Sequence, residues 1–198
     1  MKDSIRFDSY LNDKLKGLVD IQEQGVLGVD RATFDGLHDV EQDYILHQMS
    51  SKLFRVEKRH IEDMKHLVSS DFSVRIDMPA GYRFEKSAKF LRLFHRRLVD
   101  KFDIVKKIGS DSVEINQLGK ILSFGDEWVD KELVIRNRLV GDKFKNKKLK
   151  DIFIDKKLDL YTRDTSLIIL YDNCIVWVEN ISDDDTITLS LNRKILEL

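Results

Sequence analysis

The chain has 198 residues, a formal net charge of -1, 42% hydrophobic residues and 35% charged residues, which is the composition of a folded globular protein and excludes a disordered one. Its single cysteine excludes an internal disulfide and a cysteine-rich zinc site, and it fits the reducing cytoplasm, where we expect the protein to work. No apolar run approaches the ~18 residues that a membrane-spanning helix needs, so we expect no membrane partner.

Periodicity predicts that the first part of the chain, residues 1–72, is a helical region. Apolar residues recur near every 3.6 positions over residues 3–22, which predicts an amphipathic helix. Asp30 can cap the start of a second helical stretch that extends to Met49 and can divide into two short helices. A third helix is expected over residues 57–69.

Residues 73–130 follow a different pattern, and we expect them to connect the two ends of the chain. Alternating apolar residues over 72–76 predict a strand, and the turn residues at 79–81 predict a hairpin. The apolar spacing over 90–98 favours a helix, whereas short strands are expected within 113–124.

The last part, residues 131–198, predicts a small α/β module, which makes the fold class of the chain α+β. A strand is expected over 133–138. A helix over 147–157 places Leu149, Ile152 and Phe153 on one apolar face. That face is expected to pack on a hairpin of residues 167–171 and 174–178, which turns at Asp172-Asn173 and precedes a last strand over 186–191.

The histidines and the cysteine, residue types that often take part in catalysis or metal binding, are not spaced as such a site requires. His60 and His66 are six residues apart on one predicted helix, roughly 240° around it, so they do not share a face. Cys174 is expected to be a small core residue, because no base is patterned near it. The sequence therefore predicts no catalytic, cofactor-binding or metal-binding residues.

The small net charge hides two strongly basic blocks. Residues 134–150 contain seven positive side chains with Asp142 as the only acid, and residues 83–107 contain nine positive side chains against three acids. Positive clusters that the local sequence does not neutralise are typical of phosphate-binding surfaces. The ordinary alternative is that these lysines and arginines only solvate exposed faces.

The order of residues in and around the 134–150 block is specific. Arg136-Asn137-Arg138 is followed by Gly141-Asp142-Lys143-Phe144, by Lys147-Lys148-Leu149-Lys150 and then by Arg163-Asp164. This order resembles the C-terminal domain of the bacterial tRNA(Ile)-lysidine synthetases. Two further segments fit that family in the same order, so the resemblance extends over nearly the whole chain: His60-Ile61-Glu62 before the Pro79 turn, and Ile175-Val176-Trp177-Val178 near the end.

Some positions depart from the family pattern. The turn before the double lysine is very short, with only Lys145 and Asn146 between Phe144 and Lys147. Glu179-Asn180 stands where the family has Pro-Gly. In addition, the family's catalytic N-terminal PP-loop domain holds ATP phosphates with a Ser-Gly-Gly-x-Asp-Ser loop, and this sequence has no Gly-Gly pair. The resemblance thus covers the middle and C-terminal domains alone, as in a fragment or a separately encoded portion of a ligase.

The resemblance implies a function for each part. In the family, ATP activates the wobble cytidine of tRNA(Ile) and free lysine then displaces AMP. Here residues 1–72 would bind substrate and residues 131–198 would bind and position tRNA, while ATP would be used by the catalytic domain or by a second subunit, either of which is an expected partner. The predicted tRNA-binding residues are Arg136, Arg138, Lys143, Lys145, Lys147, Lys148, Lys150 and Arg163.

Functions of other classes stay open from the sequence. The chain can be a stand-alone RNA-binding module without enzymatic activity, or a protein-interaction module whose basic blocks meet acidic surfaces. The choice of tRNA, the oligomeric state and the role of residues 83–107 are not given by the sequence.

Overall fold

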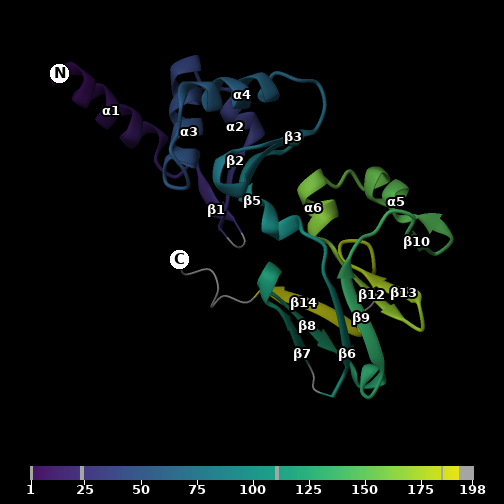
Figure 1. Ribbon diagram of the computed structural model, residues 1–198. Coiled ribbons are helices and arrows are strands. Elements are labelled where there is room, and N and C mark those ends of the chain that lie inside the picture. Colours follow the sequence, from purple (N-terminus) through teal and green to yellow (C-terminus); the bar gives the residue numbers. More distant parts are fainter. Residues whose placement is uncertain (1, 23–24, 110–111, 184, 192–198) are drawn as a thin grey trace. The chain divides into compact units, whose positions relative to one another are not determined.

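The computed structural model describes residues 2–22, 25–109, 112–183 and 185–191. The chain forms two compact units, Met1–Arg96 and Arg97–Leu198, each with helices and β-sheet (Figure 1). All strand pairs among the described residues are antiparallel. The α+β fold class predicted from the sequence is therefore confirmed.

The first unit packs helices on a five-stranded sheet of order β1-β2-β5-β4-β3. Its core is built from both layers and includes Phe34, Leu46 and Met64 from the helices and Phe84 and Leu93 from the strands. The helices are α1 (Lys2–Leu15), α2 (Arg31–Asp35), α3 (Asp39–Ser51) and α4 (Lys58–Val68). The strands are β1 (Asp20–Gln22), β2 (Val26–Asp30), β3 (Val74–Asp77), β4 (Tyr82–Lys86) and β5 (Phe90–His95).

Helix starts and stops in this unit follow local chemistry. Asp30 caps α2 as expected, because its side chain accepts a hydrogen bond of 2.8 Å from the Thr33 backbone N–H. The helix predicted over 3–22 is wrong in its second half, since α1 ends at Leu15. Gly17 follows with a φ of +81°, a left-handed conformation that commonly terminates helices, and the chain then enters β1.

The helix predicted over 90–98 is also wrong. Residues Phe90–His95 form β5, a central strand between β2 and β4, and a 3₁₀ turn, η3, follows at Arg96–Val99. Leu91, Arg92, Leu93 and Phe94 are all buried, because the strand is covered on both faces. Such a strand has no polar–apolar alternation, and its apolar run cannot be told from a buried helix by periodicity alone.

The residues expected to form a connector, 73–130, are shared between the two units. Strands β3, β4 and β5 complete the sheet that β1 and β2 begin, with the 3₁₀ turn η2 (Pro79–Gly81) in the β3–β4 hairpin. The later part contributes strands to the second unit and contains the 3₁₀ turns η4 (Asn116–Leu118) and η5 (Asp126–Trp128). Strand pairing thus divides the chain near residue 96.

The second unit contains two larger sheets that share one core. One has the order β13-β12-β9-β6 and the other has the order β14-β8-β7. Leu122, Ile135, Leu167 and Trp177 are among the residues buried in that core. The strands are β6 (Asp103–Lys107), β7 (Ser112–Ile115), β8 (Lys120–Phe124), β9 (Glu132–Asn137), β12 (Leu167–Tyr171), β13 (Cys174–Val178) and β14 (Ile187–Leu191).

A second, smaller core covers the other face of the β13-β12-β9-β6 sheet. It joins Phe144, Leu149 and Phe153 to Ile168 and Val178. The packing of the apolar helix face on the 167–178 hairpin is therefore confirmed, although α5 begins at Leu149. The elements of this layer are the two-strand hairpin β10 (Lys143–Phe144) and β11 (Lys147–Lys148), α5 (Leu149–Asp155) and α6 (Leu160–Thr165).

Two further observations complete the fold. Cys174 is exposed rather than buried, because it is the first residue of the sheet's edge strand β13, directly after the Asp172-Asn173 turn. In the part of the chain that the structure describes, none of the helices combines the length and the apolar character needed to cross a bilayer.

Candidate nucleic-acid interface

The short turn before the double lysine forms the tip of the β10–β11 hairpin. Phe144 and Lys147 face each other in register, so the connection has two residues, Lys145 and Asn146. Both have left-handed backbone angles, with φ values of 47° and 65°. This is the pattern of a type I′ turn, whose twist matches that of the two strands it joins. The turn therefore presents Lys145 at the tip of the hairpin.

Strand register separates the lysines of the hairpin into two faces. Lys143 and Lys148 are directly opposite each other, so they lie on one face, and Phe144 and Lys147 lie on the other. Phe144 is 5% exposed because it packs into the smaller core. Lys143 and Lys148 must then point away from that core, toward solvent.

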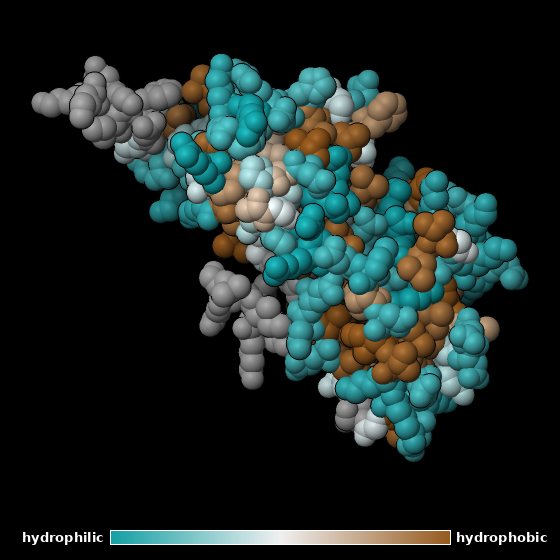
Figure 2. Space-filling view, in the orientation of Figure 1, coloured by the Kyte–Doolittle hydropathy of each residue, from teal (hydrophilic) through white to brown (hydrophobic). Residues whose placement is uncertain are grey.

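Four of the predicted lysines form an exposed group, which we call the outer lysines: Lys143, Lys145, Lys148 and Lys150. Among the described residues none of the four has an ion pair, and Lys145 lies over the Phe144 ring at 5.3 Å. The surface where Figure 1 labels β10 is mostly hydrophilic in the matching view (Figure 2). These lysines therefore offer ammonium groups to an external anion.

Lys147 behaves differently from its neighbour Lys148. Its ammonium group forms an ion pair with Asp155 at the end of α5, and this hydrogen bond raises the pKa of Lys147. The pair is exposed on both sides. Lys147 thus links the hairpin to the helix instead of standing free on the outer face.

Arg136 lies inside the protein, although the sequence predicted it as a tRNA contact. Its guanidinium group donates two hydrogen bonds of 2.8 Å to the two carboxylate oxygens of Asp142, and the two side chains are 9% and 10% exposed. Asp142 also accepts a hydrogen bond of 2.7 Å from the Leu139 backbone N–H, and its carbonyl oxygen accepts one of 2.9 Å from Leu149 N–H. This cluster ties β9 to the loop, the hairpin and the start of α5.

The charge state of Asp142 reflects this cluster. Burial alone would raise the pKa of the Asp142 carboxyl group, but the hydrogen bonds from Arg136 and Leu139 and the positive charges of Arg136 and Lys101 hold it below its ordinary value. The carboxylate is therefore ionised and remains paired at neutral pH.

The other two predicted arginines also have internal partners. Arg138 contacts Asp164 at 3.0 Å, and Arg163 donates a hydrogen bond of 2.6 Å to the Leu158 carbonyl oxygen. Lys101, which the sequence placed in the other basic block, donates a hydrogen bond of 2.7 Å to the Arg138 carbonyl oxygen, and burial lowers its pKa. The structure therefore gathers the lysines on the hairpin and α5, and uses the arginines in the framework behind them.

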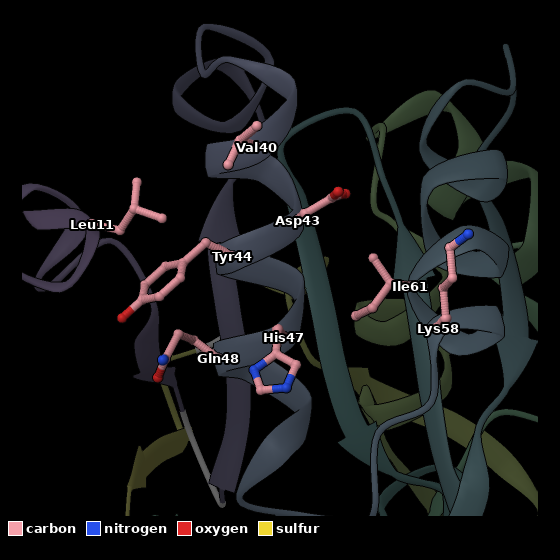
Figure 3. Close-up of a pocket in the computed structure, with 8 residues that line it drawn as sticks. All are labelled: Leu11, Val40, Asp43, Tyr44, His47, Gln48, Lys58 and Ile61. Atoms are coloured by element: carbon pink, nitrogen blue, oxygen red, sulfur yellow. The ribbon is translucent and has the colours of Figure 1, made fainter. Parts of the chain in front are cut away.

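The first unit has a separate open pocket of about 600 Å³ between α1, α3 and α4 (Figure 3). Its lining combines apolar side chains such as Leu11 and Ile61 with His47 and Asp43. Asp43 contacts Lys65 at 2.8 Å. Within the described residues there is no group of three or more His, Cys, Asp or Glu side chains placed to hold a metal ion.

The family model that matches this chain lies within the second unit. Residues 133–194 match the family model described as the TilS substrate C-terminal domain, which covers the chain from β9 through β14. A tRNA(Ile)-lysidine synthase of Caldanaerobacter subterraneus is 26% identical over 149 residues, covering 62% of this chain and 32% of that protein. A tRNA(Ile)-lysidine synthase of Persephonella marina is 42% identical over 55 residues, covering 25% of this chain and 12% of that protein.

A longer relative shows similarity as well. The bifunctional protein TilS/HprT of Listeria monocytogenes is 36% identical over 91 residues, covering 42% of this chain and 14% of that protein. The matches thus span between 12% and 32% of the length of these curated relatives.

Proposed function

We propose that the second unit binds tRNA and positions it for the formation of lysidine. This unit matches the C-terminal domain of the tRNA(Ile)-lysidine synthetase family, as the order of its motifs predicted. The substrate is then tRNA(Ile), and the modification is the conversion of its wobble cytidine to lysidine.

The outer lysines are the observation that carries this proposal. They are four exposed ammonium groups on one hairpin and the adjoining first turn of α5, without ion-pair partners among the described residues. Lysine ammonium groups bind phosphate oxygens as point charges, whereas the arginines behind them are held by carboxylates. In this proposal Lys143, Lys145, Lys148 and Lys150 contact the RNA backbone. Arg136 and Arg138 act through the framework that places the hairpin.

The proposal assigns the chemistry to another part of the enzyme. The sequence contains no Ser-Gly-Gly-x-Asp-Ser loop for ATP phosphates, so adenylation would need a PP-loop catalytic domain, in the same polypeptide or in a second subunit. Phosphate contacts position an RNA without reading its bases, and we therefore propose weak selectivity among tRNAs for this chain. A cytoplasmic location is part of the proposal and fits the low cysteine content.

A salt series on two matched double variants tests the proposal. Lys145→Ala/Lys148→Ala removes two outer lysines, and Lys106→Ala/Lys107→Ala removes two exposed lysines of β6 in the same unit. The first variant should weaken tRNA binding and flatten the log–log salt dependence by roughly 1.4–1.8 units, since each of the two lost phosphate contacts removes roughly 0.7–0.9 of a unit. The control variant should keep nearly the wild-type slope. Equal losses in both variants would mean that tRNA responds only to total charge, and would contradict the proposed interface.

A further inference from the structure

A polar cavity of about 320 Å³ lies in the first unit, beside the start of α2 and under the loop that follows α4. Arg31, Asp71, Phe72, Ser73, Lys86 and Ser87 are among the residues that line it. The size is at the lower end of the range for pockets that hold small organic ligands. None of the outer lysines belongs to this unit or lines the cavity.

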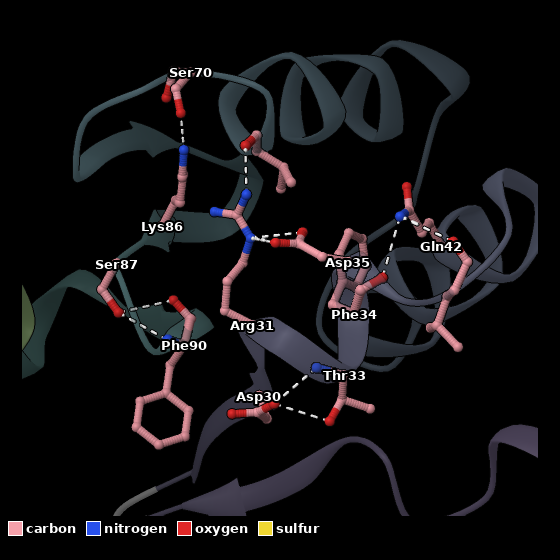
Figure 4. A network of polar contacts seen from close by, with 12 residues as sticks. Asp30, Arg31, Thr33, Phe34, Asp35, Gln42, Ser70, Lys86, Ser87 and Phe90 are labelled. Carbon is pink, nitrogen blue, oxygen red and sulfur yellow. Dashed lines mark hydrogen bonds and ion pairs between the residues drawn. The ribbon is translucent and has the colours of Figure 1, made fainter.

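Lys86 is the unusual residue of the cavity. It is 7% exposed, and its ammonium group donates a hydrogen bond to the Ser70 carbonyl oxygen (Figure 4). An ammonium group has three donors, and among the described residues no carboxylate forms an ion pair with this one. Burial lowers the pKa of Lys86, and the positive charge of Arg31 adds to this effect, against the charges of Asp71 and Asp35. A buried cation with spare donors is stabilised by a ligand that brings acceptor oxygens.

Arg31 adds hydrogen-bond donors beside Lys86 in the cavity. Its Nε–H donates to both oxygens of Asp35, at 2.7 and 2.8 Å, and its Nη2 donates to the Val68 carbonyl oxygen at 3.2 Å. Asp35, which also lines the cavity, and Arg31 compensate each other's charge in this ion pair, and the Arg31 guanidinium group lies near Lys86 in the network (Figure 4). The remaining Nη1 amino group has no hydrogen bond among the described residues, so it is available to an anion.

Phe72 provides a different kind of surface at the same cavity. Its ring is 76% exposed, although a large aromatic side chain in a small unit is normally buried. Exposed aromatic rings beside cations are the common arrangement for holding an unpaired base, because the base stacks on the ring while a cation holds its phosphate. Asp71 and Ser73 add acceptors that suit ribose hydroxyl groups.

We propose that this cavity binds a nucleotide, with the phosphate at Lys86 and Arg31 and the base stacked on Phe72. The nucleotide can be a free mononucleotide or an unpaired residue of an RNA, since both present the same phosphate, ribose and base. The site would add base contact to a chain whose hairpin offers only ammonium groups.

An NMR titration of the full chain tests the proposal with three probes: 5′-AMP, inorganic phosphate and adenosine. The backbone amides of Ser73, Ser87 and Ala88 report on the cavity. AMP should shift all three at lower concentration than phosphate or adenosine does. Phe72→Ala should weaken AMP binding by about tenfold and leave phosphate binding unchanged, because it removes only the stacking surface. Lys86→Met should remove the response to AMP and to phosphate.

Controls and a second ligand complete the experiment. Lys89→Met removes an exposed lysine between β4 and β5 and should leave both affinities unchanged. If Lys86→Met does not fold, Phe72→Ala decides the matter, since its side chain is at the surface. A single-stranded tetranucleotide that binds more tightly than AMP identifies RNA as the source, and the reverse order identifies a free nucleotide. Amides that do not respond to millimolar AMP, or that respond equally in wild type and Phe72→Ala, would overturn the proposal. Neither result depends on the hairpin variants that test tRNA binding.

Discussion

Arg136, one of the predicted tRNA contacts, is paired with Asp142 inside the fold. The Arg-Asn-Arg sequence suggests phosphate contact, but the first guanidinium group is buried in a two-bond contact with a carboxylate. Arginine suits this position because its planar group matches both carboxylate oxygens at once. A lysine at this position could offer only a point charge. We therefore expect the Arg136–Asp142 pair to fix the position of the hairpin and not to add to the charge of its surface.

The depressed pKa of Asp142 leads to a prediction on stability and pH. A carboxyl group with a lowered folded-state pKa stabilises the fold above its ordinary value of 3.8, and this contribution is lost as the pH falls through the folded-state value. Asp142→Asn should lower the unfolding free energy by about 3 kcal/mol at neutral pH, because it leaves Arg136 buried without its partner. The difference in unfolding free energy between wild type and Asp142→Asn should shrink below pH 3.8.

Denaturant unfolding followed by tryptophan fluorescence measures this gap. Both tryptophans, Trp128 and Trp177, lie in the second unit, so the signal reports on the unit that contains the pair. Lys147→Ala, which breaks the exposed pair with Asp155, serves as the control and should change stability by less than about 1 kcal/mol. A gap for Asp142→Asn that stays the same from neutral to acid pH would contradict the account of this carboxylate.

At the scale of helices and strands, the sequence predicts the elements that depend on local apolar spacing or turn residues. The α5 face of Leu149, Ile152 and Phe153 and the turn at Asp172-Asn173 have spacing or turn chemistry that needs no knowledge of the fold. The pattern predicts a helix where β5 lies, because burial of both strand faces removes the alternation. The short helix α6 was not predicted at all.

The candidate site was predictable to a similar extent. Counting charges located the hairpin lysines, but it could not separate Lys148 from Lys147, because their difference arises from strand register and from Asp155 in the next helix. The pairing of Arg138 with Asp164 joins residues 26 positions apart, and only the fold brings them together.

Packing of α5 gives the prediction at this scale. Phe153 is fully buried in the smaller core, so Phe153→Ala should lower the unfolding free energy of the second unit by about 3–5 kcal/mol through a cavity and lost burial. Ile154 is next to it and is 46% exposed, so Ile154→Ala should cost less than about 1 kcal/mol. The same tryptophan signal in denaturant checks both variants. Equal effects of the two substitutions would show that the helix is rotated relative to the described packing.

At the scale of the whole molecule, the two units differ in the surfaces that they carry. The second unit matches the family domain and presents the outer lysines, whereas the first unit contains the two cavities described above. In the second unit, Glu179 stands where the resembled family has proline; its nearly buried carboxylate pairs with Lys120 at 2.7 Å and accepts a hydrogen bond of 2.8 Å from the Leu167 backbone N–H. The departure from the family is thus used inside the fold.

The whole chain should not form lysidine on its own. It lacks the phosphate-binding loop sequence that adenylation requires, and positioning a tRNA does not activate its cytidine. The measurement is AMP release that depends on both tRNA and free lysine, with purified chain at high concentration. Release above the level of a protein-free control would contradict this prediction and would require a phosphate site elsewhere in the chain.

The most direct test of the central claim, that the outer face of the β10–β11 hairpin holds RNA phosphates, compares Lys148→Ala with Lys147→Ala. The two lysines are adjacent on one strand and lose the same charge, but they lie on opposite faces and only Lys147 is paired. In tRNA binding across a salt series, Lys148→Ala should reduce the log–log slope by roughly one unit and Lys147→Ala should leave it nearly unchanged. A wild-type slope for Lys148→Ala, or equal reductions in both variants, would contradict the claim.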